Sequence, residues 1–213
     1  IESKDVLINF CQTNNKNVAV IMTEHLDLID RQIHIHGEPI WTRNDYMDPT
    51  VQVDRIGYLL ECSPYITSYF VLGDLPELQG FSDFLPSADV RSIPFPEIDF
   101  VSSNRMDLQK SSGADFLFTG VMTNYRKDVF SMLKAENFLV NSPWRFVSRK
   151  QRNLMTRSAK LVLNIPQRAN WRWLSLQRVI AGLRSGRATV SLGTFDTSKI
   201  STCTYQLDMT SNL

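Results

Sequence analysis

The sequence contains little of what builds a disulfide framework or a metal centre. Its three cysteines, Cys11, Cys62 and Cys203, are odd in number and far apart in a chain of 213 residues. No two of them have the short spacing of a zinc site, so we predict buried free thiols in a reducing compartment. His34 and His36 would share one face of a strand, but no third ligand accompanies them, and we assign no metal.

Long apolar runs and several common enzyme motifs are also missing. No apolar run approaches the roughly 18 residues of a membrane-spanning helix. The chain has no Walker phosphate loop, no dinucleotide-binding fingerprint, no Gly-x-Ser-x-Gly elbow and no His-Glu-x-x-His motif, which argues against the commonest hydrolases. With 43% hydrophobic residues, the composition is typical of a soluble globular protein with ample material for a core.

The net charge of +1 conceals two oppositely charged halves. Residues 1–100 hold 6 Lys/Arg against 16 Asp/Glu, a balance of −10, and residues 101–213 hold 17 against 6, a balance of +11. We therefore predict two domains, 1–100 and 101–213, joined by the polar stretch 94–113. The basic half would attract phosphates or nucleic acid. Attraction between the two halves is an equally good explanation of the split.

Short β-type apolar runs alternate with segments of helical period along the chain. In the first half, strands are expected at 18–22, 69–72 and 90–93, with a helix around 54–62. In the second half, strands are expected at 115–119, 138–140, 160–165 and 188–192, with helices capped by Thr123 or Asn124, by Ser148 and by Ser175, and with Gly186 ending the last helix. This order predicts an α/β protein with parallel sheets and helices on both faces. In such sheets ligands bind beyond the carboxyl ends of the strands, near helix N-termini.

Two loops of the basic half are candidate phosphate sites on this rule. In the first, Gly120 lets a ligand approach the backbone before a capped helix, and Arg126 adds a positive charge. An ordinary strand-to-helix turn is the alternative. The second loop contains Gln167, Trp171, Ser175 and Arg178, which are candidate ligands for a phosphate and a nucleobase or sugar. The alternative is that the tryptophan packs the loop and the arginine is solvated.

Two further clusters could carry chemistry. Glu24 and His25 follow the strand 18–22, where the histidine could act as a general base oriented by a carboxylate such as Asp27; a structural histidine is the alternative. The basic run that includes Arg149 and Arg152 is typical of a solvated helix face, with phosphate or nucleic-acid contact as the other interpretation.

The segments Phe118-Thr119-Gly120, Leu161 to Ile165, and Ser175-x-x-Arg178 with Gly186 before a strand together resemble the C-terminal domain of GT-B-fold glycosyltransferases, in particular the bacterial CgeB-like group. The resemblance is carried mainly by residues 113–195. It implies two Rossmann-like domains, of which the N-terminal one lacks its first elements here. No glutamate follows Glu136, so the glutamate pair of many retaining members is missing.

The resemblance implies a metal-independent hexosyltransferase that moves a sugar from a nucleoside diphosphate sugar to a hydroxyl acceptor on a glycan, a lipid-linked molecule or a protein, without a cofactor. It places the donor diphosphate near Gly120, Arg126, Ser175 and Arg178, and the acceptor near Glu24 and His25. It also implies a cytoplasmic protein, either free or peripheral to the inner face of the membrane. A non-catalytic GT-B-like binding subunit is the main alternative, and nucleic-acid binding by the basic half is the third. The sequence leaves the donor, the acceptor and the oligomeric state open.

Overall fold

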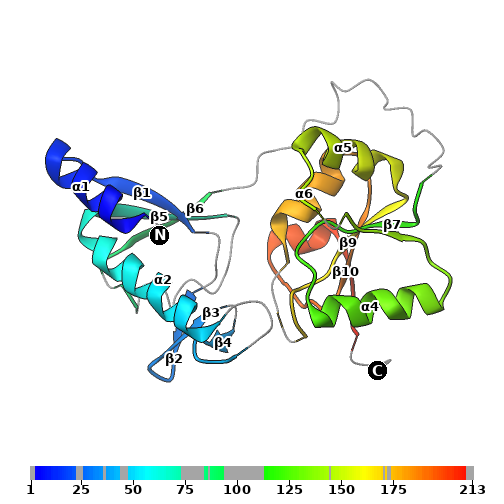
Figure 1. Ribbon diagram of the computed structural model, residues 1–213, viewed down its shortest axis with the longest axis horizontal. Coiled ribbons are helices and arrows are strands. Elements are labelled where there is room, and N and C mark those ends of the chain that lie inside the picture. The colour runs from blue at the N-terminus through cyan, green and yellow to red at the C-terminus, as the bar shows by residue number, and fades with distance from the viewer. Residues whose placement is uncertain are drawn as a thin grey trace. The chain divides into compact units, whose positions relative to one another are not determined.

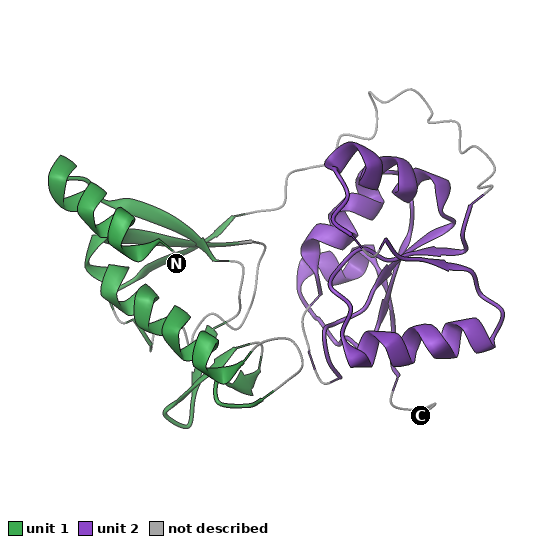
Figure 2. Cartoon of the chain, in the orientation of Figure 1, with its two compact units in different colours: residues 1–95 green, residues 96–213 purple. Residues whose placement is uncertain are grey.

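The chain divides into two compact units, residues 1–95 and 96–213, which Figure 2 colours separately. The computed structural model describes residues 3–22, 26–35, 37–43, 48–72, 84–85, 87–93, 113–143, 145–169, 171 and 174–209. Most of the predicted linker, from residue 94 to residue 112, lies outside these ranges. Within them, no helix is both long and apolar enough to cross a membrane.

Unit 1 contains a parallel sheet of three strands with the order β1-β5-β6. These strands are β1 (Val18–Met22), β5 (Ile66–Leu72) and β6 (Asp89–Ile93), accompanied by α1 (Lys4–Asn14), α2 (Pro49–Cys62) and the short η1 (Ser63–Tyr65). Asp48 caps α2 by accepting a hydrogen bond from the Thr50 amide at 2.9 Å. The three predicted strands and the predicted helix are confirmed. β1 begins at the predicted residue, and β5, β6 and α2 begin earlier than predicted.

A second, antiparallel sheet in unit 1 was not expected. It consists of β2 (Leu26–Ile29), β3 (Gln32–Ile35) and β4 (Glu38–Pro39). Asp30 and Arg31 join the first two strands, and both have positive φ, 50° and 63°, as a tight two-residue hairpin turn requires. The predicted parallel sheet is present as β1-β5-β6, and the antiparallel sheet is an addition to it, because a two-residue turn can connect only antiparallel strands.

The cysteines agree only in part with the sequence prediction. Cys11 and Cys62 are buried, and burial raises the pKa of the Cys62 thiol. Cys203, in contrast, is exposed, so the prediction of a buried thiol is wrong there. It lies at the end of a short 3₁₀ turn on the surface of unit 2.

Unit 2 is a five-stranded, wholly parallel sheet with the order β11-β10-β9-β7-β8. Its elements in chain order are β7 (Phe116–Leu117), α4 (Asn124–Ala135), β8 (Val140–Asn141), α5 (Arg149–Ser158), β9 (Leu161–Asn164), α6 (Leu176–Arg184), β10 (Thr189–Leu192), η2 (Lys199–Cys203) and β11 (Tyr205–Leu207). The predicted alternation of strands and helices is confirmed, and β11 was missed. This is the doubly wound arrangement with a sheet whose chain order reverses once.

The helices of unit 2 cover both faces of its sheet (Figure 1). α4 lies on one face, and α5 and α6 lie on the other. Right-handed crossovers require this, because the chain moves one way from β7 to β8 and the opposite way from β8 through β9 to β10. The core between these layers includes Val129 and Phe130 of α4 together with Leu163, Ile165 and Leu192.

Local capping explains where the helices of unit 2 begin and end. Thr123 caps α4, and Ser148 forms a full capping box with Gln151 at the start of α5. Gly186, at φ 64°, follows α6 in the left-handed conformation that favours glycine. Ser175 occupies the N-cap position of α6, but its side chain makes no capping hydrogen bond. The predicted cap is therefore wrong in its chemistry although right in its position.

Candidate functional site

The chain order of the unit 2 sheet reverses between β7 and β9. From β7 the chain passes to β8 on one side, and from β9 it passes to β10 on the other. The loops that follow these two strands run in opposite directions along the sheet, and open α/β sheets bind ligands at this point of their carboxyl edge, which we call the crevice. The loop after β7 contains Gly120, and the loop after β9 contains Gln167.

Arg126 ties these two loops together from inside the protein. Its side chain, 2% exposed, donates from Nη2 to the Ile165 carbonyl at 2.8 Å and from Nε to the Pro166 carbonyl at 3.0 Å. Its Nη1 donates to the carbonyl of Val121 in the loop after β7. The predicted phosphate ligand Arg126 therefore has a structural role: it joins the two loops through buried hydrogen bonds, and we call it a brace for this reason. Its positive charge lies buried near the crevice.

Thr123 makes a second connection between the same loops. Its hydroxyl donates to the Gln167 carbonyl at 2.6 Å and accepts from the Arg126 amide at 3.4 Å. The side chain is 3% exposed, so these bonds are formed away from water. One residue therefore caps α4 and is hydrogen-bonded to the neighbouring loop.

Arg178 reaches the crevice from the first turn of α6. Its Nε donates to the Thr119 carbonyl at 2.7 Å, and its Nη1 donates to the Asn164 side-chain oxygen at 3.2 Å. Asn164 is itself oriented by donating to Ser191 Oγ at 3.1 Å. Unlike Arg126, the Arg178 residue keeps part of its surface exposed.

The two guanidinium groups share one aromatic ring. The Cζ atoms of Arg126 and Arg178 each lie 4.9 Å from the centroid of the Phe118 ring, a favourable cation–π distance. Burial, and then the charge of Arg126, lower the pKa of Arg178 to about 9. The acceptors that Arg178 contacts are neutral, and in the described part of the chain no carboxylate forms an ion pair with it. An anion in the crevice would relieve this repulsion.

Gly120 keeps the space beside Arg178 open. A Cβ atom at this position would lie 2.5 Å from Nη2 of Arg178 and 3.0 Å from Cζ of Phe118. The requirement for glycine is therefore steric, since the backbone here does not adopt positive φ. Gly120 itself is exposed, so its backbone is open to solvent.

Three further predicted residues lie around the crevice with different surroundings. The Oε1 atom of Gln167 is buried, and it has no hydrogen-bond partner among the described residues. Ser175 leaves the first amides of α6 without a side-chain cap, and such amides attract anions. Trp171 is partly exposed and lies under Arg168, whose Cζ atom is 5.4 Å from the ring centroid.

Sequence reasoning missed three residues that shape this site: Phe118, Asn164 and Asp196. Asp196 is 2% exposed, and its carboxylate accepts from the Leu174 amide at 3.0 Å, just before α6. It therefore sets the start of the helix that carries Arg178. A signal existed for Asn164, since a polar residue interrupts an otherwise apolar strand. No local pattern distinguishes Phe118 from the other aromatic core residues.

The predicted catalytic residues Glu24 and His25 lie outside the described residues. The neighbouring strands place Asp27 opposite His34 in the β2–β3 register, and the Nδ1 atom of His34 is buried without a hydrogen-bond partner in the described ranges. Among the residues the structure describes, no three His, Cys, Asp or Glu side chains are grouped so that they could hold a metal ion.

Comparisons with family models, with curated proteins and with solved structures find nothing that matches this chain. The residues and their geometry are therefore the basis for any functional inference.

Proposed function

We propose that the crevice between β7 and β9 binds the diphosphate of a nucleoside diphosphate sugar, and that the protein is a GT-B-type glycosyltransferase. The observation that supports this most directly is the position of Arg178. Its partly buried side chain lies at the point where the sheet order reverses, beside the Gly120 backbone and close to a second buried cation. A diphosphate carries the negative charge that is missing among the described contacts of Arg178.

The groups around Arg178 fit a phosphate better than they fit a neutral ligand. Gly120 allows a phosphate oxygen to approach the backbone, and the uncapped start of α6 supplies amide donors. Arg126 adds long-range positive potential, although it is too deeply buried to touch the ligand. Trp171, held by Arg168 at the side of the loop, is the proposed platform for the base or the sugar.

In the proposed reaction, a hydroxyl oxygen of the acceptor forms a bond to the anomeric carbon of the donor sugar. The bond between that carbon and the diphosphate oxygen breaks, and its electron pair leaves with the diphosphate. Arg178 and the α6 amides stabilise this developing charge. The acceptor proton passes to a base, for which Glu24 and His25 are the proposed candidates if the configuration inverts.

The test is calorimetric titration of the whole chain with UDP, GDP, ADP, dTDP and CMP. We expect one diphosphate to bind, and Arg178→Gln to weaken its binding about tenfold or more, since a charge-assisted hydrogen bond contributes about 1.5–3 kcal/mol. Lys134→Gln is the matched control, because it removes an exposed cation from the last turn of α4, whereas the first turn of that helix lies beside the crevice. Equal weakening in both variants would show that only net charge matters.

Sugar transfer is then assayed with the nucleotide that binds, supplied as its sugar conjugates. Hydrolysis or transfer that disappears in Arg178→Gln supports the enzyme. Tight nucleotide binding without release of sugar from any conjugate would support the non-catalytic binding subunit instead. If none of the nucleotides binds the folded protein, the proposed donor site is wrong.

A further inference from the structure

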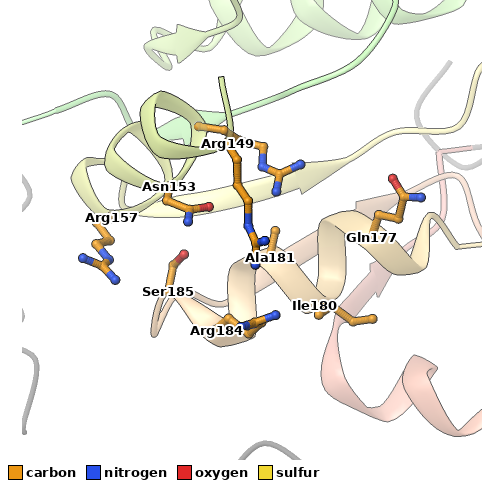
Figure 3. Close-up of a pocket in the computed structure, with 9 residues that line it drawn as sticks. Arg149, Asn153, Arg157, Gln177, Ile180, Ala181, Arg184 and Ser185 are labelled. Atoms are coloured by element: carbon orange, nitrogen blue, oxygen red, sulfur yellow. The ribbon is translucent and has the colours of Figure 1, made fainter. Parts of the chain in front are cut away.

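A second concentration of positive charge lies between α5 and α6, apart from the crevice. A cavity of about 480 Å³ is lined there by Arg149, Arg152, Asn153, Arg157, Gln177, Ile180, Ala181, Arg184 and Ser185; these residues define what we call the arginine groove. Figure 3 shows Arg149 and Arg157 at the two ends of α5 and Arg184 across from them on α6. Four of the nine lining residues are arginines, and none is acidic.

No carboxylate among the described residues neutralises the arginines of the groove. In the part of the chain that the structure describes, none of the four forms an ion pair with a carboxylate. The Nε atom of Arg152 is buried and has no hydrogen-bond partner there. An unsatisfied buried donor costs free energy, and an acceptor that enters the groove would satisfy it. Arg149, Arg157 and Arg184 are exposed, whereas Arg152 is partly buried, so the groove differs from a wholly solvated helix face at Arg152.

The groove is separate from the crevice although both use α6. Gln177, Ile180 and Arg184 stand at helical spacing and face the groove. Arg178 is rotated from Gln177 by about 100°, and it bonds to Thr119 in the loop after β7. The two sites thus lie on different faces of one helix, and the groove does not depend on the proposed function.

The lining of the groove indicates the class of ligand. From Arg149 to Arg157 the positions along α5 span about 12 Å, at 1.5 Å per residue, so the charges suit several phosphate groups and not one. None of the described residues that line the groove is aromatic, whereas proteins that bind single-stranded nucleic acid stack its bases on aromatic rings. The volume is that of a small-molecule site.

We propose that the arginine groove binds a small, multiply phosphorylated anion, recognised by its phosphates and not by a base. Guanidinium groups suit this task, because each presents several donors in a fixed plane. Asn153 and Gln177 line the same cavity and add neutral donors. The phosphates could belong to a free oligophosphate or to a phosphorylated lipid headgroup, which share this chemistry.

The test is titration of the full chain with tripolyphosphate, carried out in the Arg178→Gln background so that the crevice contributes little. We expect saturable binding that falls at least tenfold in Arg152→Gln/Arg184→Gln and stays unchanged in Lys127→Gln/Lys134→Gln, which removes two exposed cations from α4 on the opposite face. Arg152→Lys keeps the charge but removes Nε, and we expect it to bind at least threefold more weakly. Thermal unfolding of each variant verifies folding.

A second arm separates the two sources of phosphate. Phosphatidylcholine vesicles with a bisphosphorylated inositol lipid are compared with vesicles that carry the same charge as phosphatidylserine. Sedimentation with the first kind alone supports a lipid headgroup, and binding of tripolyphosphate without sedimentation supports a free anion. The proposal is overturned if neither probe binds, if the α4 variant loses as much affinity as the groove variant, or if a ten-nucleotide single strand binds more tightly than tripolyphosphate.

Discussion

Replacing Arg126 by methionine should destabilise unit 2 strongly, because Arg126 is a brace between two loops. Methionine keeps the unbranched apolar stem but removes every donor. The substitution leaves three backbone carbonyls, those of Val121, Ile165 and Pro166, without the bonds that the guanidinium group donates. A backbone carbonyl cannot rotate toward solvent as a side chain can, so the full cost of its lost hydrogen bond lowers the free energy of unfolding.

Each buried acceptor left unsatisfied costs about 1–3 kcal/mol. Two effects offset part of this sum: the charge of Arg126 no longer has to be kept out of water, and its repulsion of Arg178 disappears. Removal of one member of a buried charged network typically costs about 3–5 kcal/mol, and we expect a net loss in that range. At an m value of about 1.5 kcal/mol/M, the urea midpoint would fall by about 2 M or more.

The assay is urea unfolding followed by tryptophan fluorescence. Trp41 is the tryptophan of unit 1 and is 59% exposed, so Trp41→Phe leaves only reporters in unit 2 at little cost. Lys127→Met is the control: it makes a similar exchange one position along the same helix, at an exposed site, and should change stability by less than about 0.5 kcal/mol. If Arg126→Met lowers the free energy of unfolding by less than about 1 kcal/mol, the structural role of Arg126 is refuted, since water would then be replacing its hydrogen bonds.

Two further predictions test the crevice and a surface ion pair. Gly120→Ala should weaken nucleoside diphosphate binding about tenfold, the loss of one charge-assisted contact, because its Cβ would displace Arg178; Gly57→Ala, with nothing within 4 Å, is the calorimetric control and should leave affinity unchanged. Lys160 and the Leu139 amide hold the pKa of Asp115 below its usual range. A carboxyl group whose pKa is lowered by folding stabilises the fold above pH of about 4, and this contribution is lost as the pH falls. The difference in free energy of unfolding between wild type and Asp115→Asn, measured in urea, should therefore shrink below pH of about 4. A difference that is constant with pH would contradict this.

The helices were predictable because their determinants lie within one turn. Thr123 and Ser148 cap through the amide three residues later. Val129, Phe130 and Leu133 pack on the core, and Leu133 follows the other two by four and three positions, which is helical spacing. The strands were predictable as apolar runs, but their ends were not. The expected strand 138–140 is β8 at Val140–Asn141, since the register with β7 decides which residues pair.

The candidate site was predictable as a set of loops and not as a set of contacts. The rule that ligands bind at the carboxyl ends of strands is enough to select the loops that contain Gly120 and Gln167. The antiparallel sheet of unit 1 was missed because strands as short as β4, two residues long, carry no periodic signal. The residues of unit 1 proposed for catalysis, Glu24 and His25, lie outside the described ranges and stay a prediction.

The sequence by itself determined an α/β chain with capped helices, since those interactions join residues three or four positions apart. Only the tertiary structure decided which basic residue turns inward. Arg126 and Lys127 are neighbours on α4 with similar side chains, yet one is 2% exposed and the other lies on the surface. The difference arises from the carbonyls of Ile165 and Pro166, which accept from Arg126 across 39 and 40 positions of the chain. Such acceptors come within reach only when β9 pairs beside β7, and nothing local to α4 records that pairing.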